Sequence, residues 1–518
     1  MLLPRMEGAT GDLKAERPNW LENFLGTALI LVASLLTVGL KVPFENELIY
    51  LTLLRHRADP TYLPGDWTFS AGFEEFFVWL NVFGPLTDVF GIEAVAWAGR
   101  LLTWAAIGWA LLAIGRRLGA RPLYSAIGVV LWLGLSQSMG VGATRVISEF
   151  QARSVSYALL LGALALALDK KVPWALLASG LAFAFHPGVG IWGSSALVIS
   201  LLVLRETRFQ SLRWIWLPAL AALPGVIPQL LSFLEANMSA GDARFLALQK
   251  IPFHTDPFSF GVRGPVLLVL MLAFNLAFAW RWRTEFAHRL LGILQVVGLI
   301  PVALGVIARV LGISSFLVLL PFRILPALAP ILFLLNLAAL ASRRRLRELW
   351  PAGQPTRASL VPAVTGLLAI VGLLVIWNPV VGLASQVREN VQVARSPVSD
   401  VERTLAFVAD QTPNDAVVLG PPARDDLFYL SERSQYVSWS AIPYDRIPEW
   451  RARLEDVMPS GFFASGFRST RIWEEEFAKV PQDQLAVLPI DYVVTKAVYD
   501  FPAVFAVGDW TVYEVAGS

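Results

Sequence analysis

The chain has 518 residues, of which 56% are hydrophobic and 16% are charged. Soluble domains usually carry about a quarter charged residues, so lipid is the expected solvent for much of this chain. The net charge of +2 argues against a nucleic-acid partner. The chain has no cysteine, which excludes disulfides, thiol nucleophiles and cysteine metal sites.

Apolar runs, taken in chain order, predict a bundle of transmembrane helices. A spanning helix needs about 20 mainly apolar residues, and about eleven runs approach that length. The polar segment 1–23 precedes the first run, and no small-residue cleavage site follows it, so the run is expected to remain as a span. The runs cover residues 24–41, 94–114, 122–141, 154–168, 172–186, 188–204, 214–234, 265–281, 290–308, 314–341 and 359–378.

Basic side chains gather in alternate connections between these runs. By the positive-inside rule these connections and the N-terminus are expected in the cytoplasm, with the chain in the inner (plasma) membrane. The first loop, residues 42–93, is rich in acid and is expected outside, as is the segment 380–518. The basic residues are Arg116, Arg117, Arg121, Lys170, Lys171, Arg205, Arg208, Arg213, Arg281, Arg283, Arg289, Arg343, Arg344, Arg345 and Arg347.

The segment after residue 379 changes to the pattern of a small α/β domain. Its apolar spacing and turn residues predict alternating helices and strands. The predicted fold class is therefore an all-α polytopic membrane bundle, residues 24–379, followed by an extracytoplasmic α/β domain, residues 380–518. Helices are predicted at Ser399–Gln411, Glu449–Val457 and Arg471–Val480, and strands at Ala416–Leu419, Tyr436–Trp439, Tyr492–Thr495, Ala503–Val507 and Trp510–Val515.

The first external loop carries acidic residues at the membrane boundary. Glu45 and Glu47 follow the first span directly. Carboxylates are costly to desolvate there, so they are expected to face water, a metal or a polar substrate, and both are candidate catalytic residues. Asp66 lies in the turn-like stretch Pro64–Trp67 and is either a substrate-binding residue or a turn cap.

A second charged group precedes the span at 154–168. Arg145, Glu149 and Arg153 follow one another at intervals of four, so on a helix they would share one face. A structural salt-bridge ladder and a phosphate-binding role are both open for them. The group is predicted at the external mouth of the bundle, where charge without a partner is disfavoured.

Two further basic residues lie beside or within apolar spans. His186 closes one span and opens the next on the external side, either as a structural hydrogen-bonded residue or as a substrate ligand. Arg323 lies in the apolar stretch Leu319–Pro326, and an intramembrane arginine usually faces the bundle interior or a polar cavity. A guanidinium can bind phosphate bidentately, so a lipid phosphate is one expected partner and an acidic residue of the chain is the other.

The chain resembles the GT-C superfamily of membrane glycosyltransferases and bacterial membrane proteins of that architecture. The resemblance begins with a first span followed by a long external loop that opens with Phe44-Glu45-Asn46-Glu47. The family motif usually begins with aspartate, whereas here two glutamates flank Asn46. Further resemblance lies in Glu47–Trp67, Thr412–Pro422, Glu432–Ser434 and Glu449–Arg451.

The resemblance implies transfer of a sugar from a polyprenyl-phosphate carrier to a glycan, lipid or protein acceptor at the external face. In the family a first-loop carboxylate acts as base or metal ligand, with a divalent metal such as Mg or Mn, and basic residues hold the carrier phosphate. Carried over, Glu45 or Glu47 would be the base, and Arg323 with Arg145 or Arg153 would hold the phosphate.

Two other functions fit the same sequence features. Proline-broken spans and an intramembrane arginine also suit a transporter or flippase of a lipid-linked or envelope precursor, although no internal repeat is evident. A non-catalytic lipid-binding factor for envelope assembly is the other alternative. In each case the expected partners are membrane lipid and a polyprenyl-phosphate compound.

Overall fold

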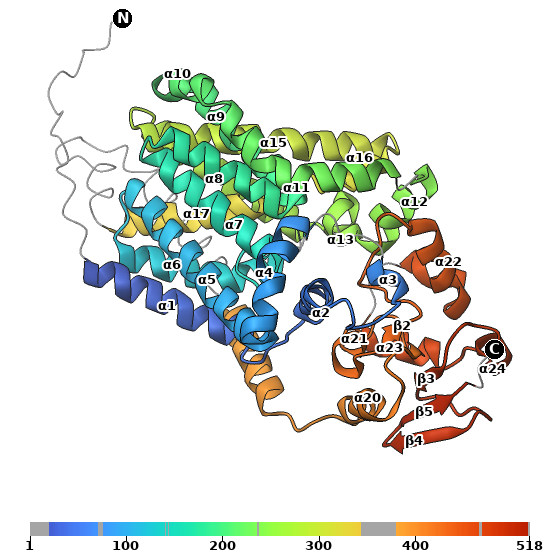
Figure 1. Ribbon diagram of the computed structural model, residues 1–518. Helices are drawn as coiled ribbons and strands as arrows, with labels where there is room; N and C mark the ends of the chain where they lie inside the picture. Colours follow the sequence, from blue (N-terminus) through green and yellow to red (C-terminus); the bar gives the residue numbers. More distant parts are fainter. Residues whose placement is uncertain are drawn as a thin grey trace, which may run out of the picture.

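The computed structural model describes residues 20–70, 76–139, 141–142, 145–235, 238–342, 380–465 and 469–515. Figure 1 shows a bundle of long helices and a smaller domain, at one end of the bundle, that holds the strands. The long helices are α1 (Trp20–Val38), α5 (Ile92–Arg117), α6 (Pro122–Met139), α7 (Ala152–Leu168), α8 (Val172–Phe185), α9 (Pro187–Val203), α11 (Trp216–Glu235), α14 (Arg263–Arg281), α15 (Phe286–Val310) and α17 (Ile324–Ala341).

The apolar helices mark a multi-pass membrane protein. Within the described ranges, 6 helices are long and apolar enough to cross a membrane, or 7 if the bent pair α9 and α10 (Arg205–Arg213) forms one span. The six are α1, α5, α11, α14, α15 and α17, while α6, α7, α8 and α4 (Phe77–Phe90) are further apolar helices. The predicted span at 359–378 lies outside the described residues, so the total of about eleven stays a prediction.

The predicted span at 314–341 is broken at Pro321, one of the prolines in its sequence. It divides into α16 (Ser314–Leu317) and α17, and the residues between them are not helical. Leu320 has a positive φ of 59°. Pro321 lacks an N–H donor and disfavours helical backbone in the residue before it, which explains the break. The break places Arg323 at the start of α17 instead of inside a helix.

The two longer connections on the side of the small domain are largely helical. The first loop forms α2 (Glu47–Ala58), α3 (Trp67–Ser70) and α4, and α2 packs against α4. The sequence predicted this segment only as an external loop, without helices of its own. The connection between α11 and α14 holds α12 (Ala240–Phe245), the π-helical turn η2 (Leu246–Lys250), α13 (Pro252–Thr255) and η3 (Pro257–Ser259).

The C-terminal domain is built on a mixed five-stranded sheet with the order β2-β1-β3-β5-β4. The strand β1 runs parallel to β2 and β3, and β5 runs antiparallel to β3 and β4. The strands are β1 (Val417–Leu419), β2 (Ser434–Gln435), β3 (Tyr492–Thr495), β4 (Ala503–Val507) and β5 (Trp510–Glu514). The helices are α20 (Asp400–Gln411), α21 (Asp426–Ser431), α22 (Ile447–Val457), η4 (Ser460–Ser465), α23 (Thr470–Phe477) and α24 (Gln482–Leu485).

Most elements of this domain were predicted within a few residues, but α21, η4 and α24 were not predicted and one strand was misplaced. A capping box between Ser399 and Glu402 begins α20, as the sequence pattern suggests. The strand predicted at Tyr436–Trp439 is wrong, because pairing with β1 ends at Gln435. Trp439 instead stacks on Trp450, with ring centroids 5.8 Å apart, so aromatic packing replaces the ladder.

The C-terminal domain docks on the first loop. Arg55 of α2 forms an ion pair with Glu432 at 2.5 Å, and the Tyr62 hydroxyl donates to the Phe428 carbonyl at 3.4 Å. The Arg453 guanidinium lies 4.2 Å from the centroid of the Trp67 ring. The first loop is therefore held between the bundle and the C-terminal domain (Figure 1).

Candidate functional site

Glu47 is a buried structural anchor at the start of α2. Its side chain and that of Arg100 both have an exposed fraction of 0%. Arg100 Nε donates to Glu47 Oε1 at 2.7 Å, and its Nη2 donates to Oε2 at 2.5 Å. The backbone N–H groups of Phe44 and Phe150 donate to the same carboxylate at 3.1 and 2.8 Å. With four donors and no exposed surface, Glu47 ties α2 to α5 and offers nothing to a substrate.

Glu45 has a different environment, although it lies two residues earlier. Its side chain is 40% exposed and forms an ion pair with Arg145. Arg145 Nη1 also lies 3.9 Å from Oε1 of Glu149. Glu149 is buried, and its Oε2 accepts from Gln151 Nε2 at 3.0 Å. The Arg145 guanidinium therefore lies close to two carboxylates, that of the partly exposed Glu45 and that of the buried Glu149.

The surroundings of Glu45 shift the pKa of its carboxyl group. Burial of the carboxyl group and the nearby charge of Glu149 raise the pKa of Glu45 to about 7, while Arg145 opposes the shift. A general base works best when its pKa lies near the operating pH. Of the two first-loop glutamates, Glu45 is therefore the better placed to accept a proton.

The prediction that Arg145, Glu149 and Arg153 share one helix face is wrong. Residues 145–151 are not helical, and α7 begins at Ala152. Neighbouring side chains bind the backbone of this segment. The Trp104 indole donates to the Ser148 carbonyl at 2.8 Å, and the Phe150 N–H donates to Glu47. The non-helical path carries Glu149 toward Arg145 and Glu45, and leaves Arg153 in the first turn of α7.

Arg153 and Arg323 form a buried basic pair inside the bundle. The positive charge of each acts on the other, and both act on His186 and Tyr157. Within the described part of the chain, Arg153 Nε and the Tyr157 hydroxyl are buried without a hydrogen-bond partner. Two buried like charges repel each other, and a bound anion would offset that cost. The pair has the chemistry of a phosphate site.

His186 serves as the N-cap of α9. Its Nδ1 accepts the N–H of Val189 at 3.2 Å, so the ring proton lies on Nε2 when the ring is neutral. This hydrogen bond gives His186 a structural role as the cap of α9. Its place beside the two arginines also puts it at the edge of the basic pair.

Arg323 lies where several parts of the chain meet. Tyr50 of α2 and Tyr444 of the C-terminal domain both interact electrostatically with it. The charges of Arg323 and Lys250 also act on His254, in the connection between α11 and α14. Residues of the bundle, of the first loop, of this connection and of the C-terminal domain therefore all lie near the basic pair.

Lys250 is a buried base on the side of the C-terminal domain. Its Nζ lies 4.1 Å from the centroid of the Trp439 ring. Burial lowers the pKa of Lys250 to about 7, and the charge of Asp425 opposes that shift. The Lys250 ammonium can therefore lose its proton near neutral pH.

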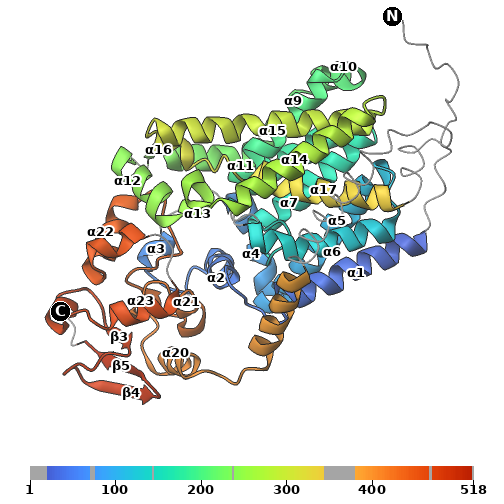
Figure 2. The ribbon, with the colours of Figure 1, turned by 180° about the vertical axis from the view of Figure 1, so that it is seen from behind.

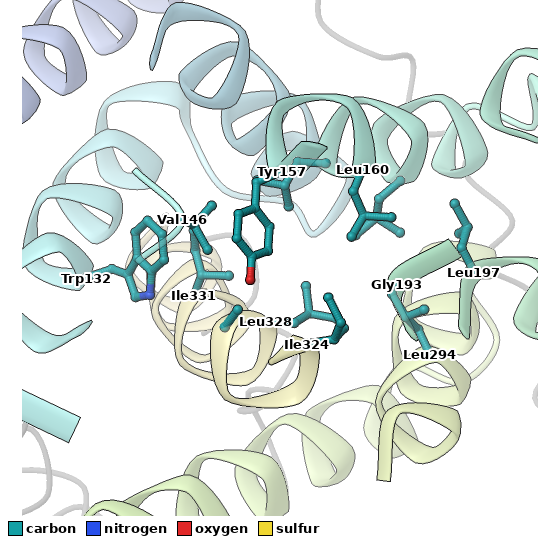
Figure 3. A pocket seen from close by; sticks show the side chains of 13 residues that line it. Trp132, Val146, Tyr157, Leu160, Gly193, Leu197, Leu294, Ile324, Leu328 and Ile331 are labelled. Atoms are coloured by element: carbon teal, nitrogen blue, oxygen red, sulfur yellow. The ribbon is translucent and has the colours of Figure 1, made fainter. Parts of the chain in front are cut away.

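An apolar cavity lies inside the bundle, and Tyr157 and Ile324 are among the side chains that line it (Figure 3). It encloses about 500 Å³, counted out to its open side. Tyr157 points into it from α7, and Ile324 follows Arg323 directly. Its lining residues are Trp132, Val146, Tyr157, Leu160, Leu161, Leu164, Gly193, Leu197, Leu294, Ile324, Ala327, Leu328 and Ile331.

A smaller, more polar cleft borders the same segment of chain. It encloses about 270 Å³, again counted out to its open side. Val146 lines the apolar cavity, whereas Arg145 and Ile147 line this cleft, so the segment forms a wall between them. The other lining residues are Thr37, Val38, Leu133, Ser148 and Gln386.

Asp66 lies apart from both groups. Its Oδ1 accepts the Phe69 N–H at 2.9 Å, at the start of α3, and its Oδ2 accepts the Gln435 N–H at 2.9 Å. Burial raises the pKa of Asp66 to about 6. These contacts favour the turn-cap alternative, extended by a bond to the C-terminal domain.

Three residues of these groups were not predicted from the sequence: Arg100, Tyr157 and Lys250. Arg100 lies in the run at 94–114, and the rule applied to Arg323, that charge inside a span has a partner, would have found it. Tyr157 and Lys250 carry no such signal, because a tyrosine in an apolar span and a lysine in a connection are ordinary. In the described ranges no group of three or more His, Asp or Glu side chains is arranged to hold a metal ion.

Comparison with known proteins gives a family match and likenesses to several solved structures. A domain of unknown function, DUF6798, matches residues 399–457, which include the part of the C-terminal domain that docks on the first loop. No curated protein matches the chain. The archaeal oligosaccharyltransferase AglB from Archaeoglobus fulgidus, solved with an inhibitory peptide and a dolichol-phosphate, is similar over 92% of this chain and 70% of its own, with 11% identity and a TM-score of 0.47. A likeness of that degree carries no argument about function.

Proposed function

We propose that the chain is a membrane glycosyltransferase that uses a polyprenyl-phosphate-linked sugar at the extracytoplasmic face. The observation that carries the proposal is the buried pair Arg153 and Arg323, together with an apolar cavity whose lining includes Tyr157, four residues after Arg153, and Ile324, which follows Arg323. A phosphate joined to a long hydrocarbon chain matches both features, since guanidinium groups bind phosphate and the cavity excludes water. The group of Glu45, Arg145 and Glu149 adds a carboxylate on the other side of the segment 145–148.

Each group has a separate role in the proposed reaction. Arg153 and Arg323 hold the carrier phosphate, and the apolar cavity takes the adjoining part of its isoprenoid chain. The acceptor hydroxyl oxygen bonds to the anomeric carbon of the sugar, and the bond from that carbon to the phosphate oxygen breaks. The hydroxyl proton passes to Glu45, and the arginines stabilise the negative charge that develops on the departing phosphate.

The proposal places the C-terminal domain outside the cytoplasm. The C-terminal ends of α5 and α14, which carry Arg117 and Arg281, lie at the end of the bundle opposite that domain (Figures 1 and 2). The positive-inside rule then puts the C-terminal domain on the external side. We expect a periplasmic reporter fused after Ser518 to be active and a cytoplasmic reporter there to be silent. The reverse result would mean that the number of spans is wrong.

Carrier binding tests the proposed phosphate site directly. We expect Arg323→Ala, and Arg153→Ala likewise, to weaken binding of a short-chain polyprenyl phosphate by more than tenfold, because truncating a buried charged ligand costs about 2–5 kcal/mol. Binding can be measured with the purified chain by tryptophan fluorescence. Arg309→Ala is the matched control, since the Arg309 guanidinium is already paired with Asp256 at 2.9 Å. Equal affinity in all three variants and the parent would refute the phosphate site.

Lipid-linked glycans distinguish the proposed enzyme from its alternatives. We expect mass spectrometry of cells that lack the protein to show a lipid-linked sugar accumulating and its transfer product missing. Carrier binding without any change in transfer product would instead favour a lipid-binding assembly factor. Accumulation on one membrane face with transfer intact in open vesicles would favour a flippase.

A further inference from the structure

The short helix α10 leaves the bundle at a sharp angle. It follows α9 with a bend of 118°, so it runs across the bundle more than along it. Both views place α10 at the end of the bundle opposite the C-terminal domain (Figures 1 and 2). It packs on α8 and α9, and an ion pair between Glu206 and Arg289 ties it to α15.

The bend is fixed by hydrogen bonds from α10 to the end of α9. A helix end leaves its last carbonyl groups without partners, which is costly at the edge of a bilayer. Here Arg208 Nε and Nη2 donate to the carbonyls of Leu202 and Val203, each at 2.9 Å. The Thr207 hydroxyl donates to the Leu201 carbonyl at 2.7 Å. These hydrogen bonds therefore hold α10 at its angle to α9.

The outer face of α10 combines arginines with large apolar side chains. Thr207 and Ser211 form its buried side. At 100° per residue, the opposite side holds Arg205, Glu206, Phe209, Leu212 and Arg213. Phe209 is 78% exposed and Leu212 is 57% exposed. This outer face would be unfavourable in plain water because of Phe209 and Leu212, and unfavourable in hydrocarbon because of its two arginines.

Nearby charge makes this end of the bundle electropositive. The acid of α10, Glu206, is paired with Arg289, and the neighbouring Asp169 is paired with Arg117 at 2.5 Å. Lys170 and Lys171 follow Asp169 in the connection between α7 and α8. Both of these acids are thus neutralised, while the arginines of the outer face and the adjacent lysines remain positive.

We propose that the outer face of α10, defined by Arg205, Phe209, Leu212 and Arg213, binds anionic phospholipid headgroups. Such a helix lies in the interface, with its apolar side chains at the boundary of the acyl chains and its basic side chains on lipid phosphates. Arginine reaches the phosphates while its hydrocarbon stem stays beside Phe209 and Leu212. The inference is independent of the proposed enzymatic function and of the phosphate site formed by Arg153 and Arg323.

Lipid titration of the full chain tests the charge preference. We expect the purified protein, titrated in detergent and observed by native mass spectrometry, to bind phosphatidylglycerol more tightly than phosphatidylcholine of the same acyl chains. The variant R205Q/R213Q should lose that preference by about fivefold for each arginine, as expected for a basic side chain near an anionic surface. The control R403Q/R471Q removes two arginines from helices of the C-terminal domain and should retain it.

Two results would overturn the inference. One is equal affinity for the two lipids in the parent protein, and the other is a double variant that keeps the full preference. Competition by free inorganic phosphate alone would point to a site for soluble anions and would also contradict a headgroup site.

The position of the helix has its own test, because the chain has no cysteine. Single cysteines in F209C and V498C can each carry one fluorescent label without other substitutions. In vesicles that contain phosphatidylglycerol, the label at position 209 should be shielded from an aqueous quencher. The label at position 498 should stay accessible, since Val498 is 92% exposed in the C-terminal domain. Equal quenching at both positions would place α10 outside the interface.

Discussion

Glu45→Gln is expected to lower the rate of sugar transfer by about 10²- to 10⁴-fold, the usual contribution of a positioned general base. Glutamine keeps the shape of the side chain but cannot accept the acceptor's proton. The measurement is transfer from a synthetic polyprenyl-phosphate sugar by the purified protein. Carrier affinity should change little, because the proposed phosphate ligands Arg153 and Arg323 remain in place.

The pH dependence gives a second test of the same carboxyl group. Since the pKa of Glu45 is raised to about 7, the carboxyl is mostly protonated below that pH and mostly ionised above it. Only the ionised form can act as a base, so the transfer rate should rise as the pH passes through about 7 and then level off. A flat profile in the parent protein, or a Glu45→Gln variant with the same rising limb, would remove Glu45 from the mechanism.

Glu47→Gln is expected to act on stability instead of on the transfer rate, with a large loss in the free energy of unfolding. Removing one partner of a buried ion pair costs about 3–5 kcal/mol of the free energy of unfolding, because it leaves the other charge buried and unpaired. Arg100 would be that charge, since its side chain is fully buried beside Glu47. Thermal or denaturant unfolding of the purified protein measures the change.

Two further variants make the stability prediction specific. Glu45→Gln breaks a partly exposed pair and should cost only about 0–1 kcal/mol, as surface pairs do. In E47Q/R100Q the uncompensated charge is also removed, so the double variant should be more stable than E47Q alone. A double variant that is less stable than E47Q, or an E47Q protein as stable as the parent, would contradict the anchoring role of Glu47.

The contrast between these two glutamates shows what the sequence could and could not predict. Composition and hydropathy predicted membrane helices, and turn residues predicted most of the C-terminal domain, because these signals are local. Glu45 and Glu47 look equivalent in sequence, since both follow the first span directly. Their difference comes from Arg100, far along the chain, whose guanidinium reaches one of them.

The residues of the candidate site, too, were predictable only where the signal was local in the sequence. Arg323 was identifiable because charge inside an apolar run needs an explanation. Its neighbour Arg153 was predicted to share one helix face with Arg145 and Glu149, and that error arose because Trp104 and Glu47 bind the backbone of residues 145–151, which is not helical. Tertiary contacts of this kind override local spacing. They decided which of the candidate residues lie together.

The docking of the C-terminal domain on the first loop has a consequence for the order of biosynthesis. The bond from the Gln435 N–H to the Asp66 carboxylate joins residues 369 positions apart, and the ion pair of Arg55 with Glu432 spans 377. At 5–20 residues per second, about 20 to 70 seconds pass between the synthesis of the two ends. During that time Asp66 lacks its second donor, and the surface of α2 that receives the domain stands open. A chain halted before the C-terminal domain therefore displays an unfinished first loop, which gives quality-control proteases a structural difference between complete and incomplete copies.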